Sequence, residues 1–279
     1  MLKRLSDTYL PTSPALLVIG VVVLIPIAWL FALSFVDAGI FSLVHYERVL
    51  FSGTYIGIFI TTLLISVYVT VLAAVLGYPI AYFIYMLPRR AAKIALFFVM
   101  LPLWTSVLVR TISWLILFQR RGPINETLQF LQIVERPLQL NSTMLAATVG
   151  MTHIVLPLFV MPTLNAMRQV DKGLLTAAAS LGARDFRRFW SVFFPLTTPG
   201  VIAGSLLVFI YSLGFYITPQ ILGGGKIVTV SMKVAENATM YSEWGASSSL
   251  AVVLLVATLV PVALLALINQ RRRSKKRGL

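Results

Sequence analysis

The chain has 279 residues, of which 58% are hydrophobic and 11% are charged, and its net charge at pH 7 is +14. A soluble domain carries about twice that charged fraction, so the composition argues against a soluble protein. The sequence contains no cysteine, which excludes disulfides, thiolate metal sites and thiol nucleophiles. A nucleic-acid-binding protein concentrates Lys and Arg on one solvated face, whereas here they form short clusters between apolar runs. That pattern is typical of a membrane protein, and no nucleic-acid partner is expected.

Six apolar stretches are long enough to cross a bilayer, which takes about 20 residues each. They lie at roughly 15–36, 55–86, 94–118, 143–167, 197–222 and 247–270. The second stretch is too short for two helices and a turn, so we expect one long, tilted helix with Gly77 and Pro79 at the point of any bend.

The distribution of Lys and Arg predicts the orientation. With the N-terminus inside, the cytoplasmic segments carry sixteen of them and the outer segments six. The first apolar run follows Lys3 and Arg4, but it is longer than a signal-peptide core and has no convincing cleavage site, so we expect a retained helix. The predicted fold class is all-α: a polytopic membrane protein with six transmembrane helices and both termini in the cytoplasm. Residues 1–279 are expected to form one membrane domain that ends in a basic tail, 271–279.

The longest predicted cytoplasmic segment, residues 168–196, contains a short amphipathic helix. Leu174, Ala178 and Leu181 fall on one helical face, and Gly182 follows where a helix end favours a residue that tolerates left-handed geometry. A helix that is small on one side and flanked by cations is suited to docking into a groove of another protein. The alternative is a helix that lies on lipid head groups, which usually needs large apolar residues rather than a run of alanines.

The same segment resembles the EAA loop of binding-protein-dependent ABC permeases. That pattern is Glu-Ala-Ala, three residues, Gly, nine residues, an aliphatic residue, any residue and Leu-Pro. The spacing matches throughout, from Ala177-Ala178 through Gly182 to Pro195. Thr176 stands where the family usually has Glu, and Phe194 where it usually has Leu, so a salt bridge at the helix start is not carried over.

Further stretches are similar to the spermidine/putrescine-type branch of this family. They are Pro102 to Thr111 with Trp114, Pro195 to Gly204, Phe215 to Gly224, and Trp244 to Ala246. The resemblance implies the type I ABC importer permease fold, in which the loop helix inserts into a cleft of the ATPase subunit. The coupling residues would be Thr176, Ala177, Ala178, Leu181, Gly182, Arg184 and Pro195.

The sequence lacks the Gly-x-x-x-x-Gly-Lys-Ser/Thr motif that cradles nucleotide phosphates. The run from Gly223 to Lys226 is followed by Ile227, so it does not complete the motif. We therefore expect no enzyme and no cofactor in this chain, with ATP and Mg²⁺ bound by partner subunits. The resemblance implies two ATP-binding-cassette subunits, a second permease subunit, an extracytoplasmic solute-binding protein and a bacterial inner membrane.

Arg110 is the one clear charge within a predicted helix, and such charges are usually functional. It lines the translocation path or pairs across a subunit interface; alternatively, it reaches the outer membrane surface through its long side chain. No carboxylate lies within the predicted helices, so a cationic solute would pass over aromatic faces. The aromatic path candidates are Trp104, Trp114, Tyr211, Phe215 and Tyr216. Aromatic residues near helix ends are, however, more often interface anchors.

Glu236 and Glu243 lie in the predicted outer loop that begins at Gly223, where they would contact the binding protein or belong to a solvated face. No metal site is expected. The predicted function is the permease subunit of an ATP-binding-cassette importer that moves a polyamine or a related amino-containing solute inward. The alternatives are a permease for another organic solute, such as an opine, and a secondary carrier, which usually holds membrane-embedded acids that are absent here.

Overall fold

The computed structural model describes residues 13–37 and 39–277. The described residues are mostly helical, and β1 (Val36–Asp37) and β2 (Ile40–Phe41) pair antiparallel with Val36 opposite Phe41. Lys3 and Arg4, which support the predicted orientation, lie outside the described residues, as do the last two residues of the basic tail. The described chain forms two compact units, residues up to 56 with 233–260, and residues 57–232 with those from 261 onward.

The first unit begins with one nearly continuous helical run, in which a π-helical stretch joins two α-helices. Its elements are α2 (Ser13–Ile19), η1 (Gly20–Leu24), α3 (Ile25–Leu33), the β-hairpin, α4 (Val44–Phe51), most of α14 (Val230–Thr239) and the first half of α15 (Trp244–Arg277). The end of the run is held by Ser34, whose hydroxyl lies 2.7 Å from the Tyr46 hydroxyl of α4. Gly245 lets α15 approach the hairpin, because a Cβ there would lie 2.5 Å from the Val36 carbonyl oxygen.

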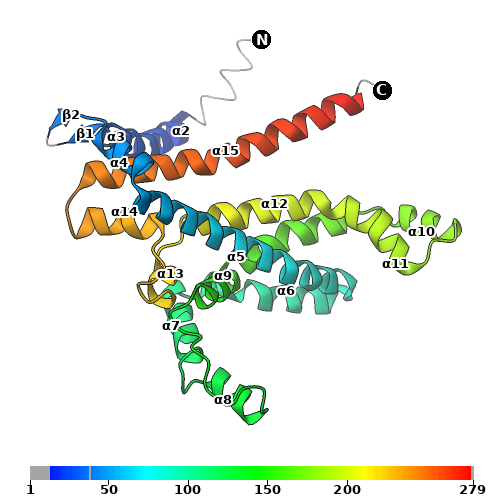
Figure 1. Cartoon of the computed structure of the whole chain (residues 1–279). Helices are drawn as coiled ribbons and strands as arrows, with labels where there is room; N and C mark the ends of the chain where they lie inside the picture. The colour runs from blue at the N-terminus through cyan, green and yellow to red at the C-terminus, as the bar shows by residue number, and fades with distance from the viewer. Residues whose placement is uncertain (1–12, 38, 278–279) are drawn as a thin grey trace. The chain divides into compact units, whose positions relative to one another are not determined.

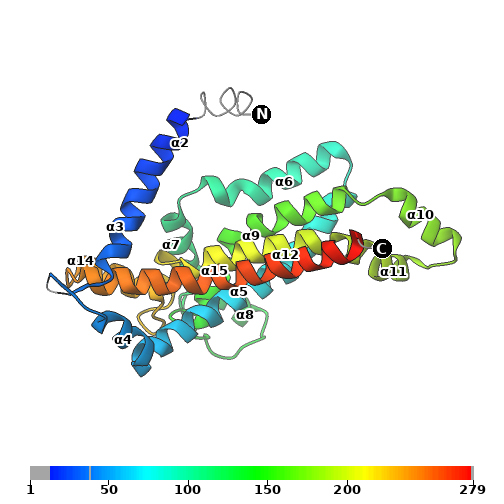
Figure 2. The ribbon, with the colours of Figure 1, turned by 90° about the horizontal axis from the view of Figure 1, so that it is seen from above.

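The second unit is built around α9, which is the most buried of its long helices. Its elements are α5 (Gly53–Met86), α6 (Arg89–Trp104), α7 (Val107–Leu117), α8 (Pro123–Phe130), α9 (Met144–Arg168), α10 (Lys172–Ser180), α11 (Asp185–Arg188), η2 (Phe189–Phe193), α12 (Phe194–Leu213) and α13 (Ile217–Leu222). Helices α9 and α12 lie side by side in both ribbon views, with α10 and α11 at one end of the pair (Figures 1 and 2).

Small residues allow α9 and α12 to pack closely. A Cβ on Gly204 would lie 2.8 Å from the Phe159 carbonyl oxygen, and one on Gly77 of α5 would lie 2.5 Å from the Phe159 ring. Phe159 is therefore enclosed by two glycines, at a position with no exposed surface. Because lipid is as apolar as a leucine side chain, close packing rather than hydrophobic burial holds such helices together.

The stretch predicted as one long helix over 55–86 is the single helix α5, which continues through Pro79. The prediction of one continuous helix over 94–118 was wrong: α6 and α7 are separated by Thr105 and Ser106 and are bent by 98°. Pro102 removes a backbone donor, and Thr105 and Ser106 adopt extended ψ angles of 149° and 133°. These residues end the helix even though the sequence around them is apolar.

The prediction of one helix over 197–222 was also wrong, because α12 ends at Leu213 and α13 begins at Ile217. The outer segment after Gly223, expected as a loop, contains helix α14. Among the described residues, three helices are long and apolar enough to cross a membrane, or four if the bent pair α6–α7 is one span. Two shorter apolar helices cover Leu17–Leu33 and Trp244–Val260, and the prediction of six spans stays a prediction.

Candidate functional site

The two helix breaks of the second unit lie next to each other. Helix α7, which follows the first break, packs against α13, which follows the second. The hydroxyls of Thr111 and Thr218 join the two helices at 3.0 Å, and neither residue has appreciable exposed surface. Two broken helices are thereby fixed to each other at the point where their backbones turn.

Side chains from nearby donate hydrogen bonds to backbone carbonyls at both breaks. Arg110 Nη2 donates to the Thr105 carbonyl at 3.0 Å, and its Nε donates to the Ser106 carbonyl at 3.4 Å. At the second break, the Phe215 carbonyl accepts from the hydroxyls of Ser231, at 2.5 Å, and Thr229, at 3.4 Å. Irregular backbone at membrane depth is tolerated only where it is buried in protein or lines a cavity.

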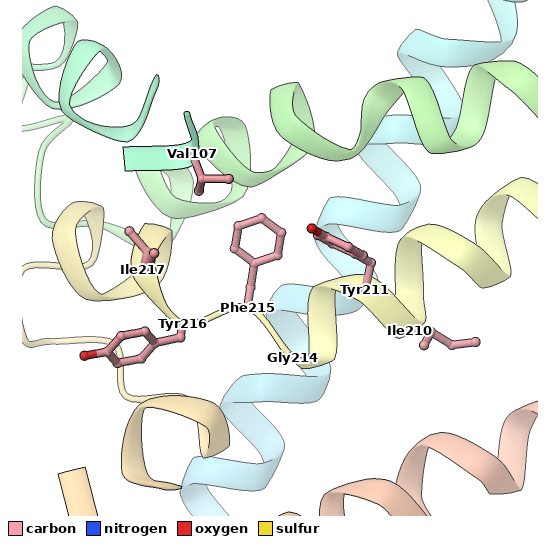
Figure 3. Close-up of a pocket in the computed structure, with 7 residues that line it drawn as sticks. All are labelled: Val107, Ile210, Tyr211, Gly214, Phe215, Tyr216 and Ile217. Atoms are coloured by element: carbon pink, nitrogen blue, oxygen red, sulfur yellow. The ribbon is translucent and has the colours of Figure 1, made fainter. Parts of the chain in front are cut away.

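A cavity of about 510 Å³ opens where these two breaks meet, a place called the double break below. It is lined by Val107, Ile210, Tyr211, Gly214, Phe215, Tyr216 and Ile217. Figure 3 shows the side chains of Val107, Tyr211 and Phe215 turned toward one another, while Tyr216 extends from the other side of the break. The rings of Tyr211 and Phe215 meet edge to face, with centroids 5.5 Å apart.

The chemistry of this lining is aromatic and uncharged. Its seven residues include three aromatic rings and no ionisable acid or base other than the two phenols. Such a surface offers π faces to a cation or apolar contact to a hydrocarbon chain, and two hydroxyls for orientation. The nearby charge of Arg110 is directed at backbone carbonyls, and only 9% of that residue is exposed.

The structure brings together some of the predicted path residues and separates others. Tyr211, Phe215 and Tyr216 line the cavity, and Arg110 supports the adjacent break. Trp114 lies further along α7, where its indole N–H donates to His153 Nδ1 at 3.2 Å. Trp104 is 70% exposed at the end of α6 and packs against Phe97, outside the cavity lining.

Four lining residues were missed by the sequence reasoning: Val107, Ile210, Gly214 and Ile217. Gly214 at the end of an apolar run, with Pro219 five positions later, is a signal for a helix break that could have located them. The breaks were missed because the helices were predicted from the length of the apolar stretches alone.

The predicted coupling segment forms α10, whose start is capped by Asp171 accepting from the Gly173 N–H at 2.8 Å. Its end is a Schellman motif, in which the Ala183 N–H donates to the Ala178 carbonyl at 3.0 Å. Gly182 supplies the left-handed residue of that motif, with φ of +82°. Thr176, at the position of the family's Glu, donates its hydroxyl to the Lys172 carbonyl at 3.1 Å.

The predicted coupling residues are accessible within the described chain. Leu181 is 90% exposed, and Thr176, Ala177, Arg184 and Pro195 are also exposed. On the opposite side of α10, Leu175 packs against the core cluster around Phe193. The helix is therefore anchored by one face while the other remains open.

In the first unit, Lys233 pairs with Glu236 at 3.0 Å, so this carboxylate already has a partner. Glu243 is exposed and lines a cavity of about 280 Å³, together with Asp37, His45 and Trp244. His45 Nε2 lies 3.5 Å from an Asp37 carboxylate oxygen. Within residues 13–37 and 39–277, no group of three or more His, Asp or Glu side chains is placed to hold a metal ion.

Residues 73–274 match the family described as binding-protein-dependent transport system inner membrane components. The chain is 31% identical over 225 residues to the spermidine/putrescine transport system permease protein PotB of Escherichia coli K12, covering 80% of this chain and 82% of that protein. It is 33% identical over 236 residues to the inner membrane ABC transporter permease protein YdcU of the same organism, covering 79% and 72% of the two chains.

The fold also matches a solved structure. It superposes on a chain of a bacterial ABC transporter involved in import of the acidic polysaccharide alginate with a TM-score of 0.72, at 15% identity and covering 96% of both chains. The family match covers most of the sequence, and the PotB relative is aligned over most of its own length. The chain belongs to the family of inner membrane components of binding-protein-dependent transport systems, as a permease of the ABC importer type.

Proposed function

We propose that this permease carries a polyamine, such as spermidine or putrescine, or a related small amino-containing solute across the inner membrane. The main observation behind this proposal is the aromatic cavity at the two helix breaks, between α6 and α7 and between α12 and α13. Tyr211, Phe215 and Tyr216 offer π faces to an ammonium group, an attraction of about 0.5–2 kcal/mol for each well-placed cation. The likeness to a spermidine/putrescine permease supports the same solute class.

The lining suits transient rather than tight binding of a cation. It contains no carboxylate, so a polyamine would be held by several weak contacts instead of one strong ion pair. A site in a transport path must release its solute, and a binding protein that delivers the solute sets most of the selectivity. The absence of an acid from this lining is thus compatible with a cationic solute.

The proposed cycle is alternating access driven by partner ATPases. Two ATP-binding-cassette subunits, which bind ATP and Mg²⁺, would engage the open face of α10 through Ala177, Ala178 and Gly182. A second permease subunit would complete the path, and an extracytoplasmic binding protein would deliver the solute, with Glu243 as a candidate contact. ATP-driven closure biases the permease between its two states because the partners bind the states with different affinity.

Uptake by cells tests the proposal. A strain whose own polyamine importers are deleted would receive this chain with the genes for its partners, and uptake of labelled putrescine and spermidine would be measured. The expected result is uptake that needs this chain and an intact ATPase. Intact ATP-dependent complexes that take up neither amine would reject the solute class while leaving the permease assignment in place.

A second candidate solute is an opine, which carries a carboxylate as well as an amine. Arg110 favours it, because its Nη1 is buried and has no hydrogen-bond partner among the described residues. A small shift at the break would let that nitrogen meet a carboxylate, which forms strong charge-assisted hydrogen bonds with arginine. Competition decides between the two: excess opine should block uptake if it is the solute, and excess spermidine should block uptake if a polyamine is. Membership of this family leaves the secondary-carrier alternative without support.

A further inference from the structure

A second cavity of the same unit lies beneath the coupling segment and plays no part in the site described above. It measures about 350 Å³. It is lined by Tyr82, Tyr85 and Met86 at the end of α5, Leu175 of α10, Asp185 and Arg188 of α11, and Phe189 and Phe193 of η2. It therefore joins the end of a long apolar helix to the segment expected to contact the ATPase.

The wall of this cavity is aromatic. Tyr82 and Phe189 meet edge to face with ring centroids 5.3 Å apart, and Tyr85 and Phe193 pack at 5.2 Å. The hydroxyls of Tyr82 and Tyr85 form no hydrogen bond with any described residue, and both residues are half-buried. The wall thus combines an apolar surface with two donors that have no partner among the described residues.

The chain segments that form this cavity are rich in arginine. Arg188 is the charged lining residue that is partly buried, with 33% of its side chain exposed, and it pairs with Asp185, whose side chain is 90% exposed. Arg184 and Arg187 are neighbours of this pair in the sequence, and Arg89 and Arg90 follow Met86 by three and four residues; all four are exposed. The stretches 82–90 and 184–193, which supply most of the lining, therefore carry five arginines and one carboxylate, and this charge favours an anion over an ammonium ion.

An anionic phospholipid matches both properties. Its phosphate would meet Arg188 and the tyrosine hydroxyls, and its acyl chains would lie along Phe189 and Phe193. Basic pockets at the cytoplasmic ends of membrane helices bind anionic head groups, and the Lys and Arg distribution predicts that this end is cytoplasmic. A polyamine leaving the path would suit the aromatic wall, but the excess of arginine in these segments would repel it.

We propose that this cavity binds one anionic phospholipid of the phosphatidylglycerol type, and that the lipid ties α10 and α11 to the inner leaflet. The position of α10 then depends on the bilayer as well as on the ATPase. The proposal rests on the proposed function only for the coupling role of α10. Lipid binding itself needs neither the solute nor ATP.

Native mass spectrometry tests the proposal on the full chain, purified with its partners and stripped of lipid. Phosphatidylglycerol and phosphatidylcholine with the same acyl chains would be titrated against wild type and three variants. We expect preference for phosphatidylglycerol and about tenfold weaker binding to Arg188→Gln, since a hydrogen bond to a charged group contributes at least that factor. Asp185→Asn should strengthen binding, because it releases Arg188 from its ion pair. Arg184→Gln removes the same charge from an exposed arginine outside the lining; as the matched control it should weaken binding much less than Arg188→Gln does.

Four results would overturn the proposal. Equal binding of the two lipids would remove the charge selectivity, and equal losses in Arg188→Gln and Arg184→Gln would indicate general surface attraction. Arg188-dependent binding of inorganic phosphate without lipid binding would identify a free-anion site, while spermidine binding weakened by Asp185→Asn would identify an amine site. Asp185→Asn is expected to bind phosphatidylglycerol more tightly, and misfolding of the variant could not produce tighter binding. Solute uptake is measured in a separate experiment. The lipid proposal and the proposed transport function can therefore fail independently of each other.

Discussion

Thr111 and Thr218 share a buried hydrogen bond of 3.0 Å that joins the two broken helices of the candidate site. Thr111 also donates its hydroxyl hydrogen to the Val107 carbonyl at 2.8 Å, so it accepts from Thr218 in the shared bond. The two residues are therefore not equivalent: Thr111 has a second partner, and Thr218 has no other partner among the described residues. This asymmetry predicts which of the two threonines, when replaced by valine, lowers the free energy of unfolding more.

Thr111→Val should destabilise the fold more than Thr218→Val. Loss of the Thr218 hydroxyl removes one interhelical bond, worth about 0.6 kcal/mol in a membrane protein. Loss of the Thr111 hydroxyl strands the buried Thr218 hydroxyl, at a cost of about 1–3 kcal/mol. Unfolding by sodium dodecyl sulfate in bicelles measures both free energies of unfolding. Equal losses, or a larger loss in Thr218→Val, would show that α7 and α13 are not joined in this way.

Gly204→Ala should lower the free energy of unfolding by about 1–3 kcal/mol, the usual cost of forcing extra volume into a packed core. The added Cβ would lie 2.8 Å from the Phe159 carbonyl oxygen and 3.1 Å from its Cα, and backbone atoms cannot move aside cheaply. Gly57→Ala is the matched control, since no described atom lies within 4 Å of its Cβ position and alanine favours a helix. The same unfolding titration applies, and a neutral Gly204→Ala would contradict the close packing of α9 and α12.

Gly182→Arg should reduce recovery of the ATPase subunit with this chain. The substitution places a bulky charge at the end of α10, and it also imposes strain because φ is +82°. Gly225→Arg is a control for the strain alone, since its φ is +75° and no described atom lies within 4 Å of its Cβ position. Tagged copies in mild detergent would be compared for ATPase content at equal membrane level. Loss of the ATPase from both variants would assign the effect to strain, and from neither would refute the coupling role.

Tyr211→Ala should weaken solute uptake at low concentration by about two- to thirtyfold, the range expected for one lost cation–π contact. Tyr211→Phe keeps the ring and should transport nearly as wild type does. Trp104→Ala is the useful comparison, because Trp104 has the same aromatic character but lies outside the cavity lining. Initial uptake rates over a range of solute concentrations provide the measurement. A larger effect of Trp104→Ala than of Tyr211→Ala would show that the solute path does not pass through the cavity at the double break.

Much of this architecture follows from the sequence because apolar length and charge clusters act locally. Helix α5 and the capped, glycine-terminated α10 are determined by residues within or next to the helix itself. The breaks after Trp104 and Leu213 are different, since the flanking residues are as apolar as the rest of their helices. A break is stabilised by distant groups such as Arg110 and Ser231, which supply the hydrogen bonds that the turned backbone loses.

The same reason explains which site residues were predicted. Tyr211, Tyr216 and Arg110 stand out by residue type, and two of them line the cavity. Val107 and Ile217 are ordinary aliphatic residues, and they reach the cavity only because two half-helices turn there. Trp104 has the expected character but the wrong position, because the bend after α6 directs the following helix away from it.

Arg110 supports two different predictions, depending on whether it stabilises the break or also contacts the solute. Its Nη2 is the side-chain donor to the Thr105 carbonyl, so Arg110→Met should leave that carbonyl without its partner and destabilise the fold by about 1–3 kcal/mol. Arg110→Lys keeps the charge but loses the planar fork that reaches two carbonyls, so it should recover only part of that stability. If Arg110 serves only the break, uptake per folded molecule will have an unchanged KM in Arg110→Lys. A raised KM for a carboxylate-bearing solute, with the KM for putrescine unchanged, would instead place the free Nη1 in contact with the solute and favour the opine class.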